Sequence, residues 1–138
     1  MKSSLIDAGP LIALFDRSDQ HHQRVIQFLK SDTGRLITTW PVLTEVCYML
    51  DFSIETQLDF LNWISDGGVE VYELKQWQIG SIHDVMEKYA DLPADFADAS
   101  LLQVAEEMEL NLIITIDRDF EVYRNQKGKS LKNLLKRS

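Results

Sequence analysis

The stretch that decides the fold is Leu112-Ile113-Ile114-Thr115-Ile116-Asp117, an apolar run that ends in an acid. An apolar run without polar alternation is typical of a strand in a parallel sheet, covered by helices on both faces. The chain begins in a similar way, because a short apolar strand over residues 3–6 is followed directly by Asp7. Functional sites of parallel sheets form outside the carboxyl ends of the strands. If the two strands are neighbours, Asp7 and Asp117 meet at one edge of the sheet.

Strand and helix patterns alternate along the rest of the chain. Further strands are expected at residues 36–38 and 69–72, and a short last strand at 121–123. Helices are expected over residues 9–15 and 75–89, and after the capping residues Ser18 or Asp19, Thr39, Ser53 and Asp95. Alternation of this kind predicts an α/β sandwich, with helices flanking a mostly parallel central sheet. One domain is expected over residues 1–138, with a basic tail at 124–138.

Length and composition exclude several classes of protein. The chain has 138 residues, 45% of them hydrophobic and 26% charged, which is ordinary for a soluble domain with a real core. No apolar run is long enough to span a bilayer, and the N-terminus does not read as a signal peptide, so a cytoplasmic location is expected. Cys47 is the only cysteine, which excludes an internal disulfide and a thiolate metal site.

The net charge of −8 is unevenly distributed. Residues 124–138 hold six basic residues and no acid, so the rest of the chain is strongly acidic. An acidic body repels phosphate chains, and nucleic acid would have to be held locally or through metal ions. The basic tail could follow a phosphate backbone. The favoured alternative is a solvated terminus, or one that docks on an acidic neighbour.

Two further acids interrupt the inward faces of predicted helices. Glu45 shares a helix face with Val42, and Asp98 shares one with Leu101, because residues three apart are neighbours on a helix. Acids among apolar residues persist only when they are paired, hydrogen-bonded or bound to metal. Asp95 lies one turn before Asp98 and could join the same site or simply cap the helix. Taken singly, each of these acids could cap a helix or a turn.

Together, the acids indicate a site for a hard divalent cation. Carboxylates a few ångströms apart repel one another, and Mg²⁺ or Mn²⁺, which prefers oxygen ligands, relieves that repulsion. No histidine or cysteine lies at a zinc-like spacing. The expected metal ligands are Asp7, Asp98 and Asp117, with Asp95 as a further candidate. If the bound cation activates water for a hydrolysis, Glu45 is expected to orient or deprotonate that water.

The chain resembles PIN-domain ribonucleases, especially the VapC-type toxins of bacterial toxin–antitoxin systems. The segments that carry the resemblance are residues 5–13, 44–46, 95–102 and 114–120. The resemblance implies that Asp7, Glu45, Asp98 and Asp117 form the acidic quartet of the family, with Thr115 as the hydroxyl residue beside the last acid. It also implies a three-layer sandwich with strand order 3-2-1-4-5, Mg²⁺- or Mn²⁺-dependent cleavage of RNA, an antitoxin partner and a homodimer. PIN toxins often carry basic residues near the groove, whereas this body is acidic.

The main hypothesis is a metal-dependent endoribonuclease that hydrolyses RNA phosphodiester bonds as the toxin of a toxin–antitoxin pair. The alternative is a catalytically silent PIN-like module that acts by binding protein or RNA. A receiver-like phosphoacceptor is disfavoured, because that fold needs an acidic pair after the first strand and a lysine after a late strand. Here Asp7 stands alone, and Asp117 is followed by Arg118.

Overall fold

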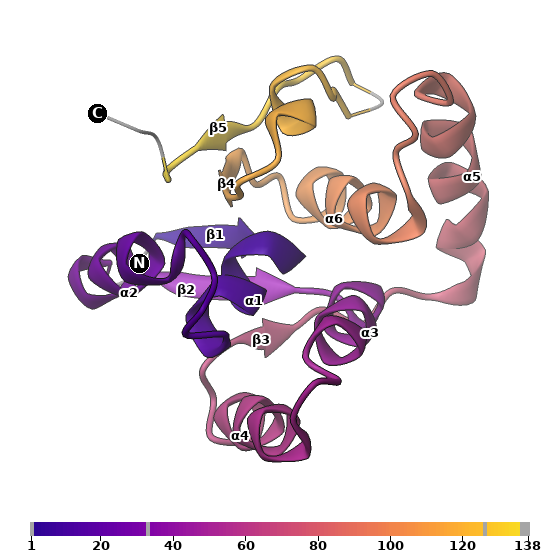
Figure 1. Ribbon diagram of the computed structural model, residues 1–138. Helices are drawn as coiled ribbons and strands as arrows, with labels where there is room; N and C mark the ends of the chain where they lie inside the picture. Colours follow the sequence, from indigo (N-terminus) through magenta and orange to yellow (C-terminus); the bar gives the residue numbers. More distant parts are fainter. Residues whose placement is uncertain (1, 33, 126, 136–138) are drawn as a thin grey trace.

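Five parallel strands form the central sheet in the described part of the chain. A computed structural model describes residues 2–32, 34–125 and 127–135. The strand order is β3-β2-β1-β4-β5, and each neighbouring pair is parallel (Figure 1). The strands are β1 (Ser3–Ile6), β2 (Arg35–Thr38), β3 (Glu70–Val71), β4 (Leu112–Ile114) and β5 (Lys132–Asn133). The expected α/β fold and the order 3-2-1-4-5 are therefore confirmed.

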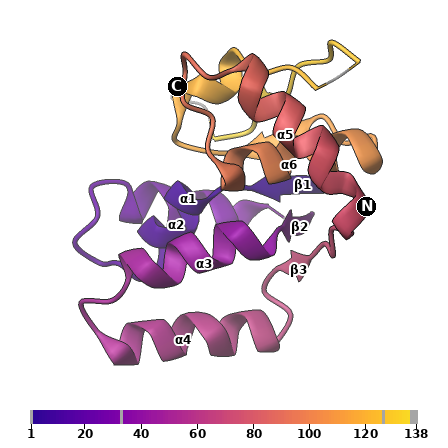
Figure 2. The same ribbon diagram turned by 90° about the vertical axis from the view of Figure 1, so that its right-hand side faces the viewer.

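Helices enclose the strands from two sides. Helices α5 and α6 lie above β1 in Figure 2, and α1 to α4 lie below it. The helices are α1 (Ala8–Phe15), α2 (His22–Ser31), α3 (Trp40–Met49), α4 (Ile54–Ser65), α5 (Ile79–Lys88) and α6 (Phe96–Glu107), with 3₁₀ turns η1 (Gln76–Gln78) and η2 (Arg118–Glu121). None of these helices, in the part of the chain that the structure describes, is long and apolar enough to cross a membrane.

Local capping decides where several helices begin. Ser53 caps α4 by accepting from the Thr56 N–H, and Asp95 caps α6, both as predicted. The second helix does not begin after Ser18 or Asp19. The Asp19 carboxylate instead accepts from the His21 N–H and closes a turn, so the helix starts three residues after Asp19.

The structure also differs from the predicted cap at Thr39 and from the single helix predicted over 75–89. Thr39 precedes α3 as predicted, but its hydroxyl bonds to Ser100 rather than capping the helix. The helix predicted over 75–89 is split into η1 and α5, because the Gln78 side chain accepts from the Lys75 N–H and closes a separate turn.

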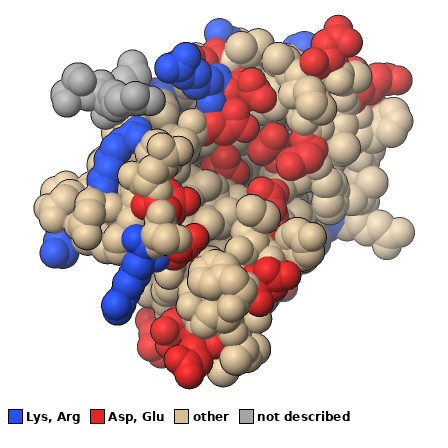
Figure 3. All heavy atoms as spheres, viewed as in Figure 1, with Lys and Arg blue, Asp and Glu red and all other residues tan. Residues whose placement is uncertain are grey.

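The C-terminal part of the chain differs most from the prediction. Residues 121–123 are not a strand, because the Asp117 carboxylate accepts from the Asp119 N–H and starts η2 instead. The fifth strand is Lys132–Asn133, inside the segment predicted to be a basic tail. Residues 126 and 136–138 of that segment lie outside the described residues. Figure 3 shows acidic side chains gathered at the centre of one face and several basic ones toward its left-hand side.

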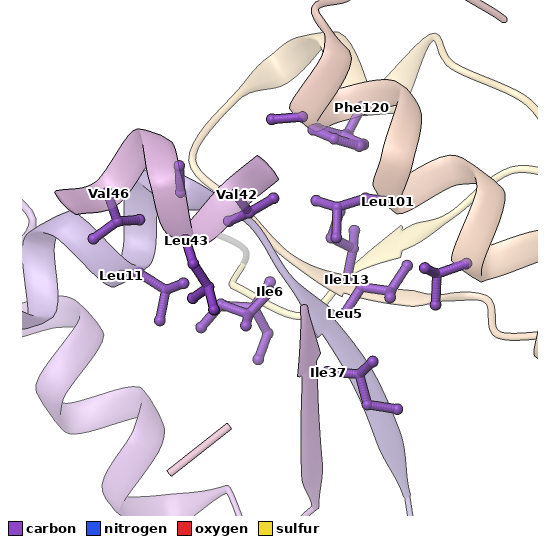
Figure 4. Packing of buried hydrophobic residues seen from close by; sticks show 14 of the residues in the cluster. Leu5, Ile6, Leu11, Ile37, Val42, Leu43, Val46, Leu101, Ile113 and Phe120 are labelled. Atoms are coloured by element: carbon purple, nitrogen blue, oxygen red, sulfur yellow. The ribbon is translucent and has the colours of Figure 1, made fainter. Parts of the chain in front are cut away.

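The hydrophobic core lies against β1, which pairs with both β2 and β4. Leu5, Ile6 and Ile113 are completely buried, and Leu101 of α6 and Val46 of α3 pack into the same cluster (Figure 4). Burying an aliphatic side chain of this size contributes about 1.5–3 kcal/mol. The core therefore fixes the central strands, and with them the edge of the sheet where the acids lie.

Candidate functional site

Asp7 and Asp117 meet at the carboxyl ends of two neighbouring strands. Strands β1 and β4 pair in parallel with Ile6 opposite Ile114, and Asp7 follows Ile6 directly. The Asp7 N–H donates to the carbonyl oxygen of Ile114 at 3.1 Å, which continues the ladder beyond the end of β1. The two strand ends therefore bring together acids that lie far apart in the sequence.

The hydroxyl of Thr115 joins these two acids. It donates to Oδ2 of Asp7 at 3.0 Å and accepts from the Asp117 N–H at 3.0 Å. The other oxygen of Asp7 accepts from the Ala8 N–H at 2.8 Å, at the start of α1. Thr115 is 1% exposed and Asp7 is 6% exposed, so the contacts are shielded from water. The orientation of the Asp7 carboxylate is therefore fixed from both sides.

Helix α6 supplies the third acid. The Asp95 carboxylate caps this helix by accepting from the Asp98 N–H at 2.8 Å. Asp98 receives a long hydrogen bond of 3.4 Å from the hydroxyl of Tyr123, which is completely buried. Asp7, Asp98 and Asp117 each offer a carboxylate oxygen, and these oxygens lie within 4.8 Å of one another. We call these three residues the acidic triad.

Glu45 and Asp95 lie beside the acidic triad rather than within it. Neither offers an oxygen within 4.8 Å of all three acids. Glu45 is half-buried on α3; burial raises its pKa, and the charges of Asp95 and Asp117 raise it further. The structure thus brings three of the four predicted catalytic acids into one group and places Glu45 within electrostatic reach of it. Asp95, the less certain metal ligand, acts here as the cap of α6.

Burial and mutual repulsion perturb the acids strongly. Burial raises the pKa of Asp7 from 3.8 to about 7, although hydrogen bonds from Ala8 and Thr115 lower it. Burial, together with the charges of Asp7, Asp95 and Asp117, likewise raises the pKa of Asp98 from 3.8 to about 8. The pKa of the Tyr123 phenol is also raised, first by burial, so this hydroxyl keeps its proton and donates to Asp98.

No basic side chain neutralises the acidic triad among the described residues. The ion pairs of the described chain join Lys2 to Asp32, Arg35 to Glu70 and His83 to Asp84. Grouped carboxylates without a basic partner are suited to a hard cation, which prefers oxygen ligands and supplies the missing charge. The donor set of the acidic triad therefore fits Mg²⁺ or Mn²⁺.

Two cavities are lined in part by the acids of this region. One of about 300 Å³ is lined by Thr115 and Asp117 together with three basic residues. The basic residues that line it are Arg118, Arg124 and Lys132. The other cavity, of about 500 Å³, is lined by Glu45 and Asp95 and by the exposed aromatic side chains of Trp40 and Phe96. The first cavity thus combines an acid of the triad with basic side chains, and the second combines Glu45 and Asp95 with aromatic side chains. We call the three basic residues of the first cavity the basic flank.

Sequence reasoning missed Asn133 and Tyr123 as residues of this region. Asn133 lies in the segment predicted to be a basic tail, yet its side chain bonds to the backbone of Thr115. Tyr123 was placed in a predicted strand and was not linked to Asp98. Neither residue carries a sequence signal, because both reach the site only through the fold.

Comparisons with known proteins agree with this architecture. A family model described as PIN domain matches residues 4–125. Nine chains of solved structures match, and one of them is VapC20 of Mycobacterium tuberculosis, described as a sarcin-ricin loop cleaving toxin. VapC20 superposes with a TM-score of 0.79 at 15% identity, over 88% of this chain and 94% of its own. At that identity the likeness shows a shared fold. A search of curated proteins finds no match.

Proposed function

Because this chain belongs to the PIN domain family, we propose that it is a metal-dependent endoribonuclease that hydrolyses phosphodiester bonds of RNA. The observation that carries the proposal is the acidic triad, three carboxylates within 4.8 Å that lack a basic partner among the described residues. Such a group is costly to fold unless a cation offsets its charge. We therefore infer that cation binding, rather than stability, is its purpose.

We assign Asp7, Asp98 and Asp117 as the residues that would hold Mg²⁺ or Mn²⁺. When bound, the ion lowers the pKa of water and offsets negative charge at the phosphate. Glu45, half-buried beside the acidic triad and with a raised pKa, is suited to orient the attacking water and accept its proton. Thr115 and the Ala8 N–H keep the Asp7 carboxylate in one orientation, so this proposed metal ligand is already oriented before substrate binds.

The basic flank supports RNA as the substrate. Arg118, Arg124 and Lys132 line a cavity that Asp117 also lines, so basic side chains share this cavity with one member of the acidic triad. A net charge of −8 disfavours binding of a polyanion elsewhere, and a local basic surface next to the acids offsets this repulsion. We propose that phosphates adjacent to the cleaved bond lie along this flank. Arg124 and Lys132, which belong to the segment predicted to be a basic tail, would then contact phosphates of the RNA.

We further propose that the protein is the toxin of a toxin–antitoxin pair, acts in the cytoplasm and forms a homodimer. The fold shared with VapC20, a toxin, supports the first point. Several large apolar side chains are exposed on α3 and α4, and a second copy or an antitoxin could cover them. These side chains are Tyr48, Met49, Ile54, Leu58 and Leu61. Light scattering of the purified protein tests the dimer, and co-purification with the product of an adjacent small gene tests the antitoxin.

Cleavage of structured RNA by the purified full-length protein tests the main proposal. We expect cleavage with Mg²⁺ or Mn²⁺, none with EDTA, and none by the variant Asp7→Asn. The matched control is Asp59→Asn, which removes one negative charge from the exposed face of α4 and should cleave like the wild type. Cleavage that persists in EDTA or in Asp7→Asn refutes the assignment. A folded protein that binds Mn²⁺ but cleaves no RNA favours a catalytically silent binding module.

A further inference from the structure

We propose that Asn133, in the C-terminal strand β5, is a positioning residue for the acidic triad. Its side chain holds Thr115 in place, and Thr115 in turn holds Asp7 and Asp117. The PIN domain match ends at residue 125, so Asn133 lies in a segment that the family match does not cover. The inference rests on the proposed function to the extent that the acidic triad binds metal.

The side-chain amide of Asn133 replaces a strand neighbour for Thr115. Its Oδ1 accepts from the Thr115 N–H at 3.2 Å, and its Nδ2 donates to the Thr115 carbonyl oxygen at 3.0 Å. A side-chain amide offers the same donor and acceptor as a peptide group. Strand β4 ends at Ile114, so these two bonds continue the pairing of β4 with β5 one residue further. Oδ1 also accepts from the Leu135 N–H at 3.0 Å, which fixes the amide itself.

Holding the backbone of Thr115 determines where its hydroxyl lies. Threonine is branched at Cβ and has few allowed χ1 rotamers, so the backbone orientation fixes the position of Oγ1. That hydroxyl donates to Asp7 and accepts from the Asp117 N–H, both at 3.0 Å. One asparagine, without touching either acid, therefore sets the positions of two members of the acidic triad. Hydrogen-bond partners of metal ligands, as Thr115 would be here, typically change metal affinity or activity 10–100-fold when they are replaced, and Asn133 acts through Thr115.

Asn125 provides a matched control in the same segment. It is 8% exposed, and its Oδ1 accepts from the Lys127 N–H at 2.9 Å and the Lys129 N–H at 3.0 Å. No described contact joins it to the acidic triad. If Asn133 only attached the C-terminal segment to the fold, Asn125→Ala and Asn133→Ala would have similar consequences. If Asn133 positions the acids, only its own replacement weakens metal binding.

Calorimetric titration of the full-length protein with Mn²⁺ alone tests the proposal. We expect Asn133→Ala to bind Mn²⁺ about 10–100-fold more weakly than the wild type, and Asn125→Ala to bind like the wild type. Thr115→Val is expected to weaken binding as well, and the double variant with Asn133→Ala to add little, because both changes break the same chain of contacts. Thr115→Ser keeps the hydroxyl and is expected to bind more tightly than Thr115→Val.

Hydrogen exchange of the Thr115 amide gives a readout that needs neither metal nor RNA. We expect faster exchange in Asn133→Ala than in the wild type, after correction for the change in global stability. Asn133→Leu serves if the alanine variant does not fold, because it keeps the volume of the side chain, adds no charge and removes both bonds to Thr115.

The proposal is overturned if Mn²⁺ affinity is unchanged in Asn133→Ala and Asn133→Leu, or falls equally in Asn125→Ala. A wild type that binds no Mn²⁺ refutes the metal site instead, and the exchange of the Thr115 amide then decides the role of Asn133 by itself. Unchanged exchange at that amide in both variants would mean that Asn133 does not hold Thr115.

Discussion

Replacing Asp7 by asparagine is expected to stabilise the metal-free protein above pH 7, although it removes a residue that we propose to be catalytic. Burial raises the pKa of Asp7 from 3.8 to about 7. The folded state therefore binds this proton more tightly than the unfolded state, and folding is penalised increasingly as the pH rises from about 4 to about 7. Above pH 7 the penalty is complete. At 1.36 kcal/mol per pKa unit, it is about 4 kcal/mol.

The asparagine side chain avoids this penalty at the loss of one hydrogen bond. Its oxygen can still accept from the Ala8 N–H, which now lies 2.8 Å from the Asp7 carboxylate. The hydroxyl of Thr115 loses its acceptor, because an NH₂ group takes the place of the second oxygen. A lost hydrogen bond of this kind is worth about 1 kcal/mol. The expected net stabilisation by Asp7→Asn is about 3 kcal/mol near pH 8 and close to zero or negative near pH 4.

Urea denaturation in EDTA across this pH range measures the difference in unfolding free energy between Asp7→Asn and the wild type. Asp59→Asn controls for the removal of one negative charge from an acidic protein. Mg²⁺ is then expected to stabilise the wild type, by about 2.7 kcal/mol at 100 times its dissociation constant, and to leave Asp7→Asn nearly unchanged. A difference that does not vary with pH, or an equal gain in Asp59→Asn, would show that Asp7 is not a buried acid with a raised pKa.

Three other substitutions probe separate parts of the structure. Tyr123→Phe removes the hydrogen bond of 3.4 Å to Asp98. Because that bond is long, the unfolding free energy measured in urea should fall by about 1 kcal/mol or less, and a much larger fall would contradict the geometry. Lys132→Gln should raise the KM for RNA at unchanged kcat. It should also lower the slope of log KM against log salt concentration by about 1, as expected for the loss of one phosphate contact; a fall in kcat alone would refute a phosphate contact by this residue. Gly68→Ala places a Cβ against the ring of Trp63 and should destabilise the protein by about 1–3 kcal/mol in thermal denaturation; an unchanged melting temperature would show that the ring moves aside without cost.

The sequence predicts the central strands and the converging acids because both depend on short, strongly patterned segments. The apolar runs before Asp7 and Asp117 are typical of strands buried in a parallel sheet, whose carboxyl ends lie at the same edge, and the cap at Asp95 is a local signal. Strand β5 has two residues, too few for any periodicity, and its position depends on its pairing with β4. A sequence pattern contains no trace of that pairing.

Residues that act across long sequence distances were also beyond prediction. Thr39 precedes α3 as expected, but its hydroxyl bonds to Ser100, and Ser100 donates in turn to the Ala97 carbonyl of α6. A threonine before a helix is predicted as a cap because that interaction is local. Here a tertiary partner has replaced it, and the contact ties α3, which carries Glu45, to the helix that carries Asp98.

The acidic triad is supported by neutral hydrogen bonds rather than by opposite charges. Thr115, Tyr123 and the Ala8 N–H all donate to its carboxylates, yet the pKa values of Asp7 and Asp98 remain raised to about 7 and about 8. A basic side chain placed among them would lower those values and remove the repulsion, but it would also compete with a cation for the same oxygens. Orientation by neutral donors therefore leaves the carboxylate oxygens free for a cation, which offsets the penalty that the fold bears once these acids are ionised.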